Sequence, residues 1–149
     1  MQSPLNVSLL CFIFFFFFDP LCLDAKMVSI VKEGVNIRSG PSTSAQVKWQ
    51  VGKGFPLQVI ESKGKWYKVK DFENDVGWVY APLTIRKDYL IVKRPEINIR
   101  SKPDVNSSIV FKAKYGVVFH STTEVGDWVK VRHDSGVTGW VARRLLWGG

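Results

Sequence analysis

Tryptophan and arginine side chains recur at a fixed spacing along this chain, and they are its best candidates for chemistry. Three of them in the first half return 62 residues later: Arg38 as Arg100, Trp66 as Trp128 and Trp78 as Trp140. An arginine can clamp a carboxylate with two parallel hydrogen bonds or stack on an aromatic ring. Tryptophans on a surface can line a shallow groove that holds an extended peptide. The chemistry that these residues indicate is recognition of a ligand.

Each of these residues also has a purely structural interpretation. The arginines can brace a loop, and the tryptophans can form the outer layer of a small core, since tryptophan is rarely buried completely. Pro82 is a further groove candidate in the first half, but Arg144 takes its place in the second. We therefore expect the better groove in the first half, if a groove forms.

Catalytic and metal-binding patterns are weak in the same sequence. The two cysteines, Cys11 and Cys22, lie in the first 25 residues, and the two histidines, His120 and His133, have no match in the first half. Their spacing fits no metal-binding motif. Three acids close together, at positions 71, 73 and 75, are expected to be solvated in a hairpin loop. We predict no catalytic residue, no metal and no cofactor.

The spacing of 62 extends to whole motifs, which predicts two tandem domains. Residues 36–41 return as 98–103, residues 64–69 as 126–131, and residues 77–79 as 139–141. A repeat of this length suits a small domain better than a solenoid turn. We expect domains at 26–85 and 90–149 with a linker at 86–89.

Short alternating segments predict that each domain is all-β. Residues 55–61, 66–71 and 76–80 read as strands, and Lys63-Gly64 supplies a turn between the first two. Tyr67 and Val69 fall on one face and return as Val129 and Val131, so that face is expected to be core. No segment has the spacing and caps of an amphipathic helix. Several short strands punctuated by Gly and Pro indicate a small barrel.

The first 25 residues stand outside the repeat and resemble a secretory signal. The apolar run from Val7 to Phe18 is too short to span a bilayer, and Ala25 offers a cleavage site. No Lys or Arg precedes the run, so a start at Met27 is the alternative. Removal of residues 1–25 would take away two acids and raise the net charge from +8 to +10. Such a surface favours anionic partners.

In their order, the repeated motifs Asn-x-Arg-Ser, Gly-x-Trp-x-Lys-Val and Gly-Trp-Val-x-x-x-Leu resemble the bacterial SH3 family over residues 28–85 and 90–147. The resemblance implies two tandem SH3-like barrels of five to six strands each. The second copy departs from the pattern at Lys102 and Pro95. Members of this family are typically extracytoplasmic modules that bind cell-wall or other peptides, so a periplasmic or secreted location is implied.

Three functions follow as hypotheses. The first is a non-catalytic exported module that binds peptidoglycan or another envelope peptide, through the candidates named above, with no stable membrane span after loss of the leader. The second is an adaptor that binds a peptide segment of a partner protein. The third is a nucleic-acid-binding protein, suggested by the charge and by Trp and Lys on one strand, and it requires that the chain is not exported. We favour the first and expect no nucleic acid as partner.

Overall fold

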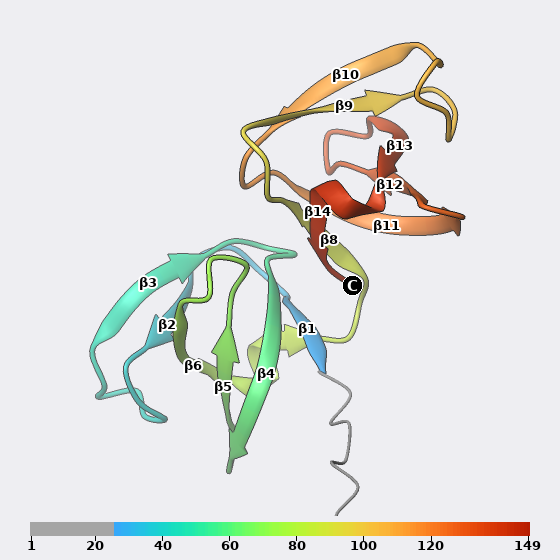
Figure 1. Cartoon of the computed structure of the whole chain (residues 1–149). Helices are drawn as coiled ribbons and strands as arrows, with labels where there is room; N and C mark the ends of the chain where they lie inside the picture. Colours follow the sequence, from blue (N-terminus) through green and yellow to red (C-terminus); the bar gives the residue numbers. More distant parts are fainter. Residues whose placement is uncertain (1–25) are drawn as a thin grey trace, which may run out of the picture.

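A computed structural model describes residues 26–149, and the predicted leader lies outside the described residues. The chain forms two units of the same design (Figure 1). The first unit contains β1 (Met27–Ile30), β2 (Val35–Arg38), β3 (Val47–Val51), β4 (Pro56–Lys63), β5 (Trp66–Lys70), β6 (Val76–Tyr80), the 3-10 turn η1 (Ala81–Leu83) and β7 (Thr84–Ile85). The second contains β8 (Tyr89–Val92), β9 (Glu96–Arg100), β10 (Ile109–Lys114), β11 (Val118–Val125), β12 (Trp128–Arg132), β13 (Thr138–Ala142), the 3-10 turn η2 (Arg143–Leu145) and β14 (Leu146–Gly148).

The two units have the same strand order, which confirms the prediction of two tandem SH3-like barrels. One sheet runs β3-β2-β6-β5-β4-β1-β7 and the other β10-β9-β13-β12-β11-β8-β14, and every pairing is antiparallel. Each sheet has seven strands, more than the five to six expected, because the short closing strands β7 and β14 are too brief to show an alternating pattern. Within residues 26–149, no helix is long and apolar enough to cross a membrane.

The core of each unit is a small cluster of buried aliphatic side chains. Val69, Val129 and Val131 are fully buried, as the repeated strand pattern predicted. Tyr67 is only half-buried and packs at the edge of the first cluster. At the next level of each core, Leu57 in the first unit is replaced by the larger Phe119 in the second.

Two glycines allow β2 and β6, and their counterparts β9 and β13, to pack tightly. A Cβ on Gly77 would lie 2.4 Å from Ile37 Cγ2, and one on Gly139 would lie 2.5 Å from Ile99 Cγ2. Both distances are far below van der Waals contact, so any side chain here would displace a buried isoleucine. The Gly-Trp-Val motif is therefore required by packing.

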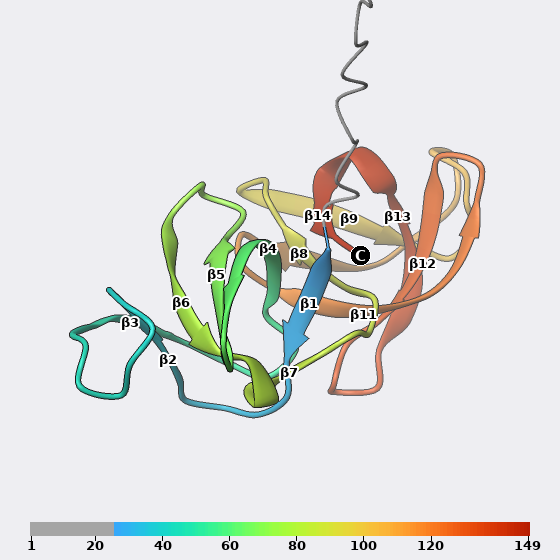
Figure 2. The same cartoon turned by 90° about the horizontal axis from the view of Figure 1, so that it is seen from below.

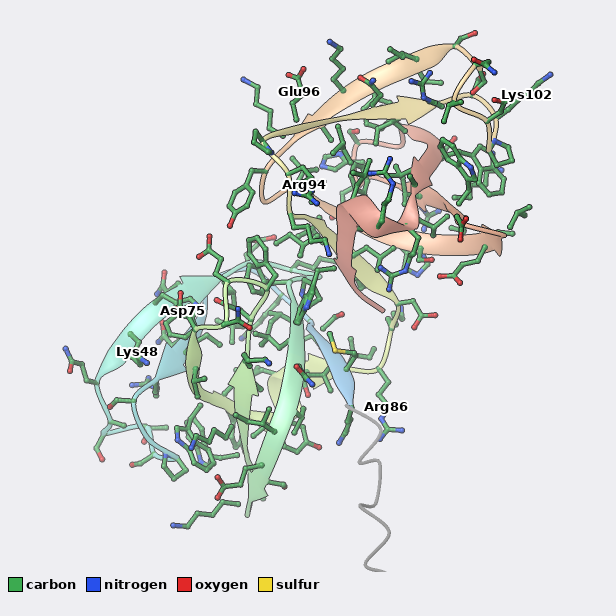
Figure 3. The ribbon with its side chains drawn as sticks, in the orientation of Figure 1. Lys48, Asp75, Arg86, Arg94, Glu96 and Lys102 are labelled. Carbon is green, nitrogen blue, oxygen red and sulfur yellow. The ribbon has the colours of Figure 1, made fainter. Side chains whose placement is uncertain are left out.

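The two units meet at a seam formed by Lys53, Phe72 and Glu73 of the first unit and Tyr115 and Asp134 of the second. The rings of Phe72 and Tyr115 lie 5.2 Å apart, and the Tyr115 hydroxyl donates a hydrogen bond to the Glu73 carboxylate. Lys53 Nζ lies 3.7 Å from Asp134 Oδ2. Figure 3 labels Asp75 and Arg94 on the sides of the two units that face each other, close to the seam.

Candidate functional site

Each unit carries one shallow groove, and the two grooves occupy equivalent positions. The first groove, about 220 Å³, is lined by Lys32, Gly34, Val35, Asn36, Arg38, Thr43, Trp66, Tyr80 and Leu83. The second groove, about 230 Å³, is lined by Glu96, Ile97, Asn98, Arg100, Val105, Trp128, Ala142, Arg144 and Leu145. Most of these residues correspond at the spacing of 62. The same hollow therefore forms twice, between the N-terminal part of the second strand and the 3-10 turn.

The predicted arginine and tryptophan come together in each groove. β2 delivers Arg38 and β5 begins with Trp66, while β9 and β12 deliver Arg100 and Trp128. All four side chains are half-buried, so each keeps surface available to a ligand. A guanidinium beside an indole face is an arrangement that can hold a carboxylate and an apolar group of one ligand.

Both arginines also brace a loop, which was their structural interpretation. Arg38 Nη1 donates to the Ala45 carbonyl at 2.9 Å, and Arg100 Nη1 donates to the Ser107 carbonyl at 2.8 Å. A guanidinium has five N–H donors, so one bond to the loop leaves others for a ligand. Bracing thus fixes the direction of the arginine that lines the groove. Its role in binding stays a prediction.

The remaining candidates lie outside the two grooves. Trp78 is on β6 and Trp140 on β13, where each sits opposite the arginine of the neighbouring strand, but neither lines a groove. Pro82 lies within η1 and is also absent from the lining, whereas Arg144 at the matching position lines the second groove.

The aromatic content of the two grooves differs at one position that the sequence analysis left open. In the first groove Trp66 packs against Tyr80, with ring centroids 5.5 Å apart. Ala142 replaces Tyr80 in the second groove, so a methyl group faces Trp128 there. The first groove is more aromatic and the second leaves more of its indole uncovered. The exchange of Tyr for Ala at the constant spacing was the signal for this difference.

The charges of the grooves favour an anionic ligand in both. Lys32 and Arg38 line the first groove without an acid, and Arg100 and Arg144 line the second. The second also contains Glu96, whose carboxylate lies 3.4 Å from Lys112 Nζ and is offset by it. Figure 3 shows Glu96 and Lys102 near the two ends of β9, the strand that runs along this groove.

A third pocket, about 500 Å³, lies beside the turn between β5 and β6 and contains the acidic cluster. The cluster was expected to be solvated, and this is wrong for Asp71, which is only 5% exposed. Asp71 Oδ1 accepts hydrogen bonds from the backbone N–H groups of Glu73 and Asp75, both at 2.9 Å, and so it shapes the turn. Burial raises the pKa of Asp71 above 3.8, although these two bonds oppose the shift.

This acidic cluster is the one group within residues 26–149 with metal-ligand spacing. Its three carboxylates have oxygens within 4.8 Å of one another. However, Asp71 already accepts two backbone hydrogen bonds, and Glu73 accepts one from Tyr115. These contacts give the acids a structural role in the turn and the seam.

Comparison with known proteins places the repeat in a family. Residues 31–84 and 93–148 match the family model described as the bacterial SH3 domain. Over 131 residues the chain is 24% identical to a candidate N-acetylmuramoyl-L-alanine amidase, YrvJ, of Bacillus subtilis (strain 168). That match covers 80% of this chain and 25% of the relative, so the chain spans about a quarter of its length.

Solved structures with the same type of unit include two proteins named for NlpC. NlpC1 from Trichomonas vaginalis matches with a TM-score of 0.37 and 11% identity, over 84% of this chain and 46% of that one. An NlpC/P60 family protein from Bacillus cereus ATCC 10987 matches with a TM-score of 0.39 and 13% identity, over 82% and 56% of the two chains. The chain thus spans about half the length of each.

Proposed function

The chain belongs to the bacterial SH3 domain family, and from this premise we propose that it is an exported, non-catalytic module that binds peptide segments of peptidoglycan. The observation that carries the proposal is the groove that occurs twice with an arginine and a tryptophan in place. A groove maintained in two copies whose other surfaces differ indicates a binding function. The similarity to a candidate amidase supports a cell-wall ligand.

The groove chemistry narrows the ligand to a peptide that bears a carboxylate. Each groove combines two cationic side chains with one indole and aliphatic walls. Peptide stems of the bacterial wall carry free carboxylates and small apolar side chains, which match this pairing. The first unit offers the stacked pair Trp66 and Tyr80 to the apolar part, and the second offers Arg144 to the charged part.

Co-sedimentation of residues 26–149 with purified peptidoglycan sacculi across a salt series tests the proposal. We expect wild-type protein to stay bound at moderate salt, and a Trp66→Ala/Trp128→Ala double variant to lose at least ten-fold in affinity. Salt screens contacts between exposed charges, so binding by a basic surface alone would fall steeply for both proteins.

A Trp78→Ala/Trp140→Ala double variant is the matched control, because it removes two indoles that line neither groove. Circular dichroism and thermal unfolding establish that both variants fold. Equal loss of binding in the two variants would place the binding surface outside the grooves. No binding by the wild-type protein at any salt concentration would overturn the wall ligand and favour a protein partner.

A further inference from the structure

The seam between the units is built from equivalent positions, so the units are related by an approximate two-fold rotation. Lys53 corresponds to Tyr115, and Phe72 corresponds to Asp134, at the spacing of 62. Phe72 meets Tyr115 on one side of the seam, and Asp134 meets Lys53 on the other. The same two surface positions therefore pair reciprocally, as in an isologous dimer interface. One side is an aromatic contact and the other an ion pair.

Close packing on one side of this seam limits movement of the units. Gly54 has φ +79°, and a Cβ there would lie 2.7 Å from Tyr89 Cδ1 and 3.1 Å from Val118 Cγ1. The second unit thus approaches the backbone of the first too closely for a side chain. The connection is also held, because Ser29 Oγ donates to the Lys87 carbonyl at 3.1 Å.

The seam leaves both grooves open. The residues that form it lie in the β3–β4 and β5–β6 turns of the first unit and their counterparts in the second, and none of them lines a groove. Trp66 and Tyr80 stand at the ends of β5 and β6 far from the seam turn, and Trp128 and Ala142 stand likewise in the second unit.

The grooves open on opposite sides of the molecule. Leu83 and Leu145, which line them, belong to the turns η1 and η2. In Figure 2 the turn before β7 lies at the lower edge of the molecule and the red turn before β14 at the upper edge. A two-fold rotation across the seam produces this opposition, because it carries one groove onto the other.

We infer that the chain is a two-headed binder that bridges two separate peptide-bearing strands. The inference rests on the proposed function of the grooves. A second site strengthens the grip on one strand only when that strand can reach both sites. Grooves that face opposite ways across a packed seam do not offer one strand that path. They hold one strand on each side, which joins neighbouring strands of a wall.

Light scattering with soluble, uncrosslinked glycan strands that carry their peptide stems tests the bridging. We expect scattering to rise as residues 26–149 are added, to pass through a maximum, and to fall at excess protein, when every stem is bound by a separate molecule. Calorimetry with a short single-stem muropeptide needs no variant, and we expect two bound fragments per chain. An excess of that fragment should abolish the scattering.

Trp66→Ala and Trp128→Ala single variants, each checked for folding, complete the experiment. Each is expected to bind one fragment and to give no scattering, because one head remains. Binding of strands by wild-type protein without scattering at any ratio would overturn the bridging and leave the binding function intact. Scattering by both single variants would also overturn it. Failure of the wild-type protein to bind strands or fragment would overturn both proposals.

Discussion

Two arginines show how far single residues reveal their roles before their surroundings are known. Arg38 and Arg100 recur in a repeated motif, which left bracing and binding as equal alternatives. The structure shows the bracing directly, through bonds to the Ala45 and Ser107 carbonyls. It also puts the same guanidiniums in the grooves. One residue satisfies both interpretations because its several N–H groups point in different directions.

Glycine at position 77 is the residue for which the packing makes the sharpest prediction. In Gly77→Ala the new Cβ would meet Ile37 Cγ2 at 2.4 Å, so we expect a loss of about 1–3 kcal/mol in the free energy of unfolding. Urea unfolding measures it. Gly64→Ala is the control, because that site has open space and only its φ of +58° opposes a side chain, at a cost of about 1 kcal/mol. A free-energy loss no greater than that of the control would contradict the packing argument.

The turns between strands were harder to predict than the strands themselves. The alternation in residues 66–71 correctly assigned Val69 to the core, because side chains on a strand alternate between faces. No such rule governs the turn that follows. Asp71 was expected in solvent, yet it is buried and bonds to the backbone of its own turn. A lone acid before a polar loop has the same appearance in either case.

The buried carboxyl of this turn predicts a pH dependence. Burial raises the pKa of Asp71 in the folded chain above 3.8, so its contribution to stability is greatest below that pH and declines as the pH rises through the folded pKa. Asp71→Asn keeps an oxygen for the two backbone N–H groups and lacks this decline. We expect the stability of the variant relative to wild type to increase with pH across this window, measured by urea unfolding.

Asp127→Asn, at an exposed site in the hairpin turn before β12, is the matched control for loss of one charge. A relative stability of Asp71→Asn that stays level with pH, as for a simple charge change, would mean that burial does not govern this carboxyl.

The relation of the two units is a property of the whole molecule. The seam pairs Phe72 with Tyr115 and Lys53 with Asp134, although each position has a different residue type in the two copies. The ion pair is exposed and contributes about 0–1 kcal/mol, so the aromatic side carries more of the seam. The exchanges of Lys for Tyr and Phe for Asp were visible in the repeat, but nothing in the sequence paired them.

The tyrosine of the seam provides a spectroscopic test of that contact. The hydrogen bond to Glu73 raises the pKa of Tyr115 from 10.0 to about 12. The bond is therefore fully present below pH 10.0 and is lost as the pH rises toward 12. Glu73→Gln removes the charge, and we expect the ultraviolet titration of this phenol to move back toward its ordinary range.

Glu61→Gln removes an equal charge from an ion pair with Lys68 and serves as the control for that titration. Titration of all tyrosines alike in wild type and Glu73→Gln would show that Tyr115 and Glu73 are not in contact in solution.

The sequence alone determined the two-fold repeat, the all-β class and the membership of the cores, because each depends on local periodicity and on motifs that recur at one spacing. It also named the arginine and tryptophan of each groove as candidates. Only the tertiary structure decided that Trp78, Trp140 and Pro82 stand outside the grooves, that Asp71 is buried, and that the two grooves face opposite sides. These features depend on contacts between residues far apart in the chain, which no local pattern encodes.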